Sequence, residues 1–189
     1  MDPIRVRHSL QHVQQLYDSG EDRSKLENLI RAFRGIQDLP PDNPKSFFYI
    51  GSLHGLPFHG PGETDPEWWG GYCCHRSILF PTWHRIYILY LEDALRSIPG
   101  CEDVTLPFWD QLLHLESTSE PVIPSVFTSP TFSLDGRTDN PLYSYKLQKA
   151  LGDEKNRYSK PAKYETVRYP LSGEYRIVAA LLLVATSRF

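Results

Sequence analysis

The sequence predicts a mainly α-helical domain whose helices are joined by long, ordered loops. Apolar residues recur at helical spacing in three segments of the first 100 residues, and proline or glycine follows each segment. Aromatic residues make up 13% of the chain and there are 16 prolines, which favours a core connected by structured loops. A length of 189 residues suits one domain, and such a chain buries enough surface to form a core without disulfides.

The first two helices are expected at residues 4–18 and 24–37. The second has the clearer pattern, because its apolar residues keep helical spacing and Ser24 with Glu27 fits a capping box. Pro40 and Pro41 end it.

Two further helices surround a long loop. Asn43 and Pro44 fit the start of a helix that ends at Gly55, and the loop over 55–74 is long enough to suggest a functional role. The strongest helical pattern follows at 81–98, and it is apolar around most of its circumference, so we expect it to be mostly buried. Periodicity is weak after Asp110, with one short helix expected near 143–151.

Charge and cysteine content exclude several classes of protein. The net charge of −3 gives no basic surplus for nucleic-acid binding, and three cysteines do not form a complete disulfide framework. The first ten residues contain no apolar segment typical of a secretory signal. The longest apolar run, 177–185, is too short to cross a membrane. We therefore expect an intracellular, cytoplasmic protein.

Histidines are concentrated in one part of the chain. Four of the seven lie between His54 and His84, and none follows His114. Neutral imidazoles bind copper and zinc, and three of them leave a coordination position open. His54 ends one predicted helix, His84 begins another, and His75 precedes the second helix in a loop. These three residues are the predicted metal ligands.

Other interpretations of the same residues remain open. A histidine in an apolar segment is often a hydrogen-bonded core residue, and the metal could be zinc in a hydrolase whose general base is Glu63 or Glu67. The chain could also be a non-enzymatic fragment that pairs with another chain. The remaining histidines and the tryptophans are expected outside the ligand set: His59 in the loop, His8, His12 and His114 at the surface or behind the site, and Trp68, Trp69 and Trp83 in the core.

Three stretches resemble one known family. They are SFFYIGSLHGLP, YCCHRSILFPTWHRIYILYLEDAL and LPFWD, and they contain HG-x-P, C-x-H-x₈-H and FPTWHR. In these motifs the sequence resembles the first copper half of tyrosinases and catechol oxidases, the type-3 copper phenol oxidases. The motifs are most similar to those of the fungal enzymes. The resemblance covers most of residues 24–172 and is most specific over 47–110.

The resemblance implies particular roles. His54, His75 and His84 match the three ligands of the first copper, CuA, and Cys73 matches a cysteine that forms a thioether bond to the second histidine. An ordinary buried thiol is the alternative for Cys73, and Cys74 departs from the family pattern. The implied reaction oxidises mono- and o-diphenols with O₂ to o-quinones, which feed pigment (melanin) formation. Monophenolase and diphenolase activity, the natural phenol and the oligomeric state stay open.

The family pattern is incomplete in this sequence. The second copper, CuB, needs three downstream histidines, and none follows residue 114. We therefore expect residues 1–173 to form the N-terminal part of a tyrosinase copper-binding domain, an incomplete helical bundle that holds at most one copper. Residues 174–189 are expected to be an aberrant apolar tail from a shifted reading frame, a retained intron or an early stop. Transcript sequencing across codons 170–190 tests this.

Overall fold

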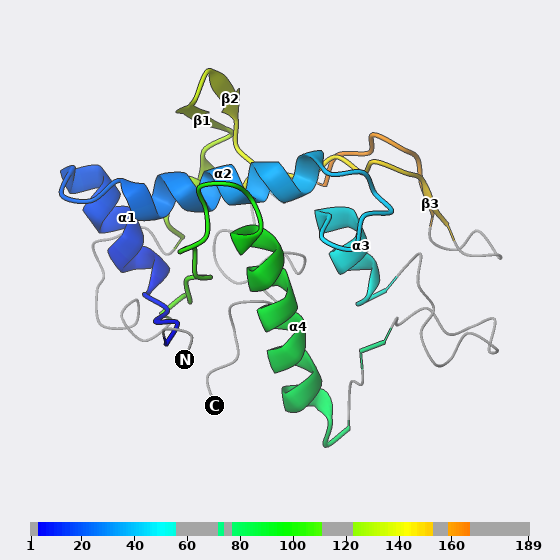
Figure 1. The fold of residues 1–189 in the computed structure, drawn as a ribbon. Helices are drawn as coiled ribbons and strands as arrows, with labels where there is room; N and C mark the ends of the chain where they lie inside the picture. Colours follow the sequence, from blue (N-terminus) through cyan, green and yellow to red (C-terminus); the bar gives the residue numbers. More distant parts are fainter. Residues whose placement is uncertain (1–3, 56–71, 74–76, 111–122, 153–158, 167–189) are drawn as a thin grey trace.

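The computed structural model describes residues 4–55, 72–73, 77–110, 123–152 and 159–166. In these residues the protein is mainly helical, as predicted, with two small antiparallel sheets (Figure 1). The elements are α1 Leu10–Ser19, α2 Ser24–Asp38, α3 Phe47–Ser52, α4 Phe80–Arg96, α6 Ser125–Thr128, β1 Thr131–Leu134, β2 Arg137–Asp139, β3 Leu151–Gly152 and β4 Ser159–Lys160. No helix in these residues is both long and apolar enough to cross a membrane. The predicted tail at 174–189 lies outside the described residues.

The first helix is shorter than predicted. Ser9 caps α1 by accepting a hydrogen bond from the backbone N–H of His12, and Gly20 ends the helix with a positive φ of 76°. Residues 4–9 are extended, because the backbone around His8 and Ser9 pairs with Phe108 instead of forming a helical turn. The N-terminal segment therefore lies beside the segment that follows α4.

Helix α2 is the centre of the core, and α1, α3 and α4 all pack against it (Figure 1). Its predicted range was correct to one residue, but the capping box does not form: the Asp22 carboxylate accepts from the N–H and hydroxyl of Ser24. Gly35 permits a close approach to the end of α4, since a Cβ there would lie 2.7 Å from the Ile98 side chain. The fully buried side chains of this helix include Leu26, Ile30 and Ile36.

Helix α4 is buried on one face only, so the prediction of a mostly buried helix was wrong. His84, Ile88, Leu91 and Leu95 are buried toward the core. The opposite face is exposed and of mixed polarity. It carries Ile86 at 64% and Leu89 at 46% exposure beside the exposed polar residues Thr82, Arg85 and Asp93. Exposed apolar side chains close together often pack against another element.

A buried carboxylate ties α4 to the N-terminal segment. Glu92, with no exposed surface, accepts from Arg5 at 3.2 Å, from Arg7 at 3.0 Å and from the backbone N–H of Leu106 at 2.9 Å. A buried carboxylate requires this kind of compensation, because removing it from water costs several kcal/mol. Glu92 thus joins three chain segments in the C-terminal half of the helix that carries His84.

Residues 143–151 do not form the predicted short helix. Leu147 exchanges backbone hydrogen bonds with Lys163 and Tyr164, and β3 pairs with β4 immediately afterwards. The aromatic side chain of Tyr145 instead packs with Phe48 in a small second cluster. Pairing with a distant segment therefore overrides the weak local helical pattern.

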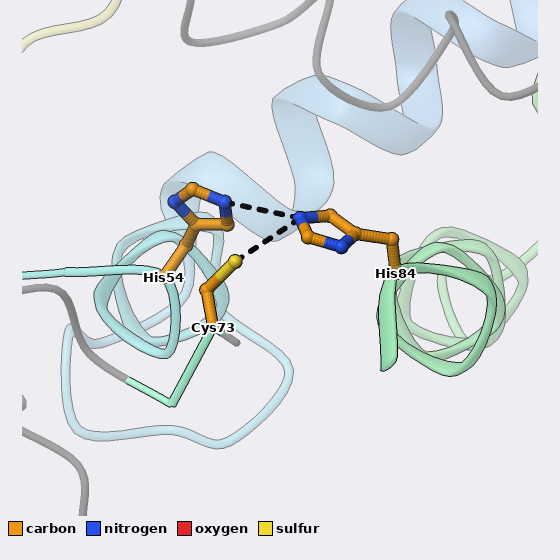
Figure 2. Close-up of side chains that lie close together, drawn as sticks. All are labelled: His54, Cys73 and His84. Atoms are coloured by element: carbon orange, nitrogen blue, oxygen red, sulfur yellow. Dashed lines mark hydrogen bonds between the residues drawn. The ribbon is translucent and has the colours of Figure 1, made fainter. Parts of the chain in front are cut away.

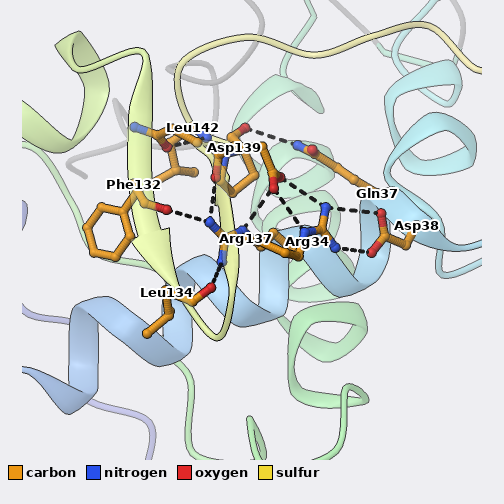
Figure 3. A network of polar contacts seen from close by, with 10 residues as sticks. Arg34, Gln37, Asp38, Phe132, Leu134, Arg137, Asp139 and Leu142 are labelled. Atoms are coloured by element: carbon orange, nitrogen blue, oxygen red, sulfur yellow. Dashed lines mark hydrogen bonds and ion pairs between the residues drawn. The ribbon is translucent and has the colours of Figure 1, made fainter.

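Arginine side chains fasten the β1–β2 hairpin to α2 (Figure 3). Arg34, whose side chain is 5% exposed, donates to the backbone carbonyls of Phe132, Leu134 and Asp139. On the outer side Arg137, from β2, bonds the carboxylates of Asp38 and Asp139. Arg34 is thus the buried connection between the hairpin and α2, and Arg31, which donates to Asp135, is a further exposed one.

Replacing Arg34 with methionine should lower the free energy of unfolding by about 3 kcal/mol, because three carbonyl acceptors lose a charged donor. Urea denaturation followed by circular dichroism measures this loss. The matched Arg137→Met variant should cost less than about 1 kcal/mol, since that ion-pair network is exposed to solvent. Equal losses in the two variants would contradict the role assigned to the buried side chain.

Candidate metal centre

Helix α3 positions His54. Ser46 caps this six-residue helix by accepting from the N–H of Tyr49 at 3.0 Å, so the helix starts three residues after the predicted Asn43–Pro44 start. A tight turn then follows, in which the His54 N–H donates to the carbonyl of Gly51 at 3.1 Å. Helix α3 ends at Ser52 rather than at the predicted Gly55, so His54 lies in the turn just after the helix.

Helix α4 fixes both the position and the tautomer of His84. The helix begins at Phe80 with Pro81 in its first turn, and the Nδ1 atom of His84 lies 2.7 Å from the carbonyl oxygen of Phe80. A carbonyl only accepts, so Nδ1 carries the proton and Nε2 presents its lone pair. The ring is 4% exposed, which leaves Nε2 pointing into the interior rather than into water.

Three ligand atoms converge at this point (Figure 2). The Nε2 atoms of His54 and His84 are 3.3 Å apart, and the Sγ atom of Cys73 is 3.2 Å from Nε2 of His84. The three atoms all lie within 4.8 Å of one another. Two imidazole nitrogens at about 2.0–2.1 Å from a tetrahedral ion are separated by roughly 3.3 Å. The two histidines are therefore already spaced for one metal ion.

Aromatic rings surround the two imidazoles. Trp83 and Tyr87 stack at 4.9 Å between ring centroids, and both contact the His54 ring at 5.8 and 5.9 Å. Phe80 packs against His84 at 4.1 Å. These rings limit the access of water to the ligand nitrogens, a condition that tunes metal affinity. Trp83, which was expected in the core, is half-buried, and its ring contacts both histidines.

Tyr87 also links the two helices that carry the histidines. Its hydroxyl on α4 donates to the Ile50 carbonyl on α3 at 2.9 Å. Burial raises the pKa of this hydroxyl above its ordinary value of 10.0. The sequence placed Tyr87 on the same face as His84, but the spacing carried no sign that its hydroxyl joins α3.

The remaining predicted site residues have different outcomes. His75 and Cys74 lie outside the described residues, as do His59, His114, Trp68, Trp69, Glu63 and Glu67. The third-ligand role of His75 and the thioether bond from Cys73 therefore stay predictions. In the described residues Cys73 is buried at 3% exposure and its sulfur faces the ring of His84. His12 is exposed and His8 half-buried, away from the cluster, as expected.

The sequence and the fold both match known proteins. A family model described as the common central domain of tyrosinase matches residues 44–177, which is more than half of the chain. The chain belongs to the tyrosinase family. It is 52% identical over 183 residues to tyrosinase HcTyr2 of Hahella sp. and 45% identical over 157 residues to a tyrosinase of Aspergillus oryzae. The resemblance is thus not confined to fungal relatives.

A solved structure supports the tyrosinase fold. The tyrosinase of Burkholderia thailandensis matches 90% of this chain with a TM-score of 0.72 and 47% sequence identity. The chain covers 34% of that structure, 32% of the Hahella protein and 28% of the Aspergillus protein. It therefore spans about a third of the length of these tyrosinases and corresponds to part of their fold.

Replacing Tyr87 with phenylalanine should lower the free energy of unfolding by about 1 kcal/mol, because the Ile50 carbonyl loses its donor. The loss should depend on pH. Since the folded-state pKa of Tyr87 is raised, the unfolded chain ionises first above pH 10, and the stability of the unmodified protein falls there. The variant lacks this contribution, so its stability should fall less steeply between pH 9 and 11.

Urea denaturation at several pH values measures both effects. Tyr49→Phe is the matched control, because it removes a tyrosine hydroxyl from α3, the helix that Tyr87 contacts. A Tyr87→Phe variant with the same alkaline slope as the unmodified protein would show that this hydroxyl is not the group that titrates.

Proposed function

We propose that this chain provides one copper site of a tyrosinase-type oxidase. His54, His75 and His84 are the proposed ligands, and Cys73 is proposed to form the thioether bond to His75. The observation that supports this most directly is the 3.3 Å separation of the His54 and His84 Nε2 atoms, each on a different helix. Membership of the tyrosinase family favours copper over zinc.

The residues around the ion have definable roles in this proposal. Copper, when bound, supplies the one-electron steps through which O₂ oxidises a mono- or o-diphenol to an o-quinone. The Phe80 carbonyl keeps the Nε2 lone pair of His84 available by holding the proton on Nδ1. Trp83 and Tyr87 contact the half-buried ring of His54 and limit its exposure to water. Pigment formation from the quinone is the corresponding physiological role.

We further propose that the second copper of the pair needs ligands from outside these 189 residues. None of the seven histidines follows His114, and the chain covers only about a third of its relatives. The exposed apolar side chains of Ile86 and Leu89 on α4 are suited to packing against the part of the fold that would carry those ligands. The isolated chain should therefore take up copper without efficient phenol oxidation.

The test combines metal analysis with an activity assay. The purified chain is loaded with Cu⁺ or Zn²⁺, passed through a desalting column, and analysed for metal and for oxidation of an o-diphenol. We expect one retained copper per chain, preference for copper over zinc, and little oxidation. Retention of zinc in preference to copper would contradict the proposed oxidase site. Rapid diphenol oxidation by the chain alone would contradict the proposal that a second set of ligands is missing.

A further inference from the structure

The N-terminal region contains a second pair of histidines that the proposed copper site does not use. The ring centroids of His8 and His12 are 5.8 Å apart, with an angle of 38° between the planes. His12 is exposed and His8 is half-buried, so both rings are reachable from solvent. We propose that His8 and His12 form a separate surface site for a divalent transition-metal ion such as Cu²⁺, Ni²⁺ or Zn²⁺.

The separation of the rings fits a shared ion. A metal–nitrogen bond of about 2.0–2.1 Å places each ring centroid roughly 3 Å from the ion, so two coordinated rings lie about 5–6 Å apart. Imidazole is a preferred ligand of these ions. The ion would therefore bridge the rings with only side-chain adjustment.

The backbone holds both histidines in place. The His8 carbonyl accepts from the Phe108 N–H at 3.0 Å, and the next residue, Ser9, accepts through its hydroxyl from the His12 N–H at 3.2 Å. His12 thus belongs to the first turn of α1, while His8 belongs to the paired N-terminal segment. A site whose backbone is fixed in this way loses less entropy when an ion binds.

The surrounding charges are partly compensated. Arg7, which precedes His8 in the sequence, forms an ion pair with Glu92. His8 also borders a surface cavity of about 410 Å³, whose lining includes Lys25, Arg96 and Asp103. The positive charges of Lys25 and Arg96 make the site weaker than the internal one, and the open coordination positions would be filled by water. Binding should therefore be reversible and dependent on metal concentration.

An ion at this site would also have a structural effect. His8 lies on the segment that delivers Arg5 and Arg7 to the buried carboxylate of Glu92, and His12 lies on α1. A shared ion would fasten that segment to the helix. An ion that binds only the folded state stabilises it, so the unfolding temperature should rise as the ion concentration rises.

The test uses Ni²⁺ and Cu²⁺ with the whole chain. Isothermal titration and Cu²⁺ electron paramagnetic resonance should show a weak site that His8→Ala or His12→Ala weakens at least tenfold. Gln15→Ala, an exposed change on α1, is the matched control and should leave it intact. The His54→Ala/His84→Ala double variant should also retain this weak site, which separates it from the proposed copper centre.

Thermal unfolding gives an independent measurement. In the His54→Ala/His84→Ala background, which removes the internal site, Ni²⁺ should raise the unfolding temperature of the chain and of its Gln15→Ala variant, but not that of its His12→Ala variant. If His8→Ala and His12→Ala bind Ni²⁺ and Cu²⁺ as the unmodified chain does, or if the weak site is lost only in the His54/His84 variant, the proposed surface site is wrong. If only the proposed internal copper site is wrong, the titration and the thermal unfolding should still show the weak site of His8 and His12.

Discussion

Replacing His84 with alanine should abolish stable copper uptake at the proposed internal site, with a loss of affinity on the order of 100-fold or more. The variant removes the imidazole whose tautomer the Phe80 carbonyl fixes, and it leaves His54 facing a cavity. Changes in groups that merely orient a ligand already cost 10–100-fold in metal affinity, so loss of the ligand should cost at least as much. Competition with a chromophoric Cu⁺ chelator measures the change.

His12→Ala is the matched control for this experiment, since it removes an imidazole from α1 outside the cluster. It should retain the tightly held copper. Circular dichroism of both variants establishes that each still folds. Copper affinity that is unchanged in His54→Ala, His75→Ala and His84→Ala alike would remove the basis for the proposed oxidase site.

The second large effect is expected at Glu92. Glu92→Ala should lower the free energy of unfolding by about 3 kcal/mol, because the Leu106 N–H is left buried without an acceptor and Arg5 and Arg7 lose their common partner. The loss should also weaken copper binding modestly, since Glu92 fixes α4 two helical turns from His84. Urea denaturation and the chelator assay measure the two effects separately.

Asp93→Asn is the control at the neighbouring position. Asp93 also pairs with Arg5, but its side chain is 59% exposed, so the change should cost less than about 1 kcal/mol. A Glu92→Ala variant as stable as Asp93→Asn would show that the buried network contributes little to the fold.

The helices could be predicted from the sequence where periodicity and end signals agreed. Helix α2 has both, and its predicted range of 24–37 differs from the observed one by a single residue. The two wrong helical predictions, over 4–9 and 143–151, concern segments whose backbone pairs with Phe108 or Tyr164, far away in sequence. Local spacing contains no information about such partners.

The histidines of the candidate site could be predicted from the sequence, but the contacts around them could not. Histidine spacing and motif resemblance identified His54 and His84, and the structure brings their nitrogens together. The contacts of Trp83 and Tyr87 could not be read from spacing, because both depend on how α3 approaches α4. The exposed face of α4 was also missed, since an apolar circumference in sequence does not reveal which elements are available to cover it.

The shortness of α3 affects how the protein would acquire its metal. Six residues make less than two helical turns, and a helix of that length has little stability of its own. An ion shared by His54 and His84 would act as a cross-link between α3 and α4, so metallation and local folding should be coupled. The metal-free chain should then be cleaved by proteases first around His54, and the loaded chain should resist that cleavage.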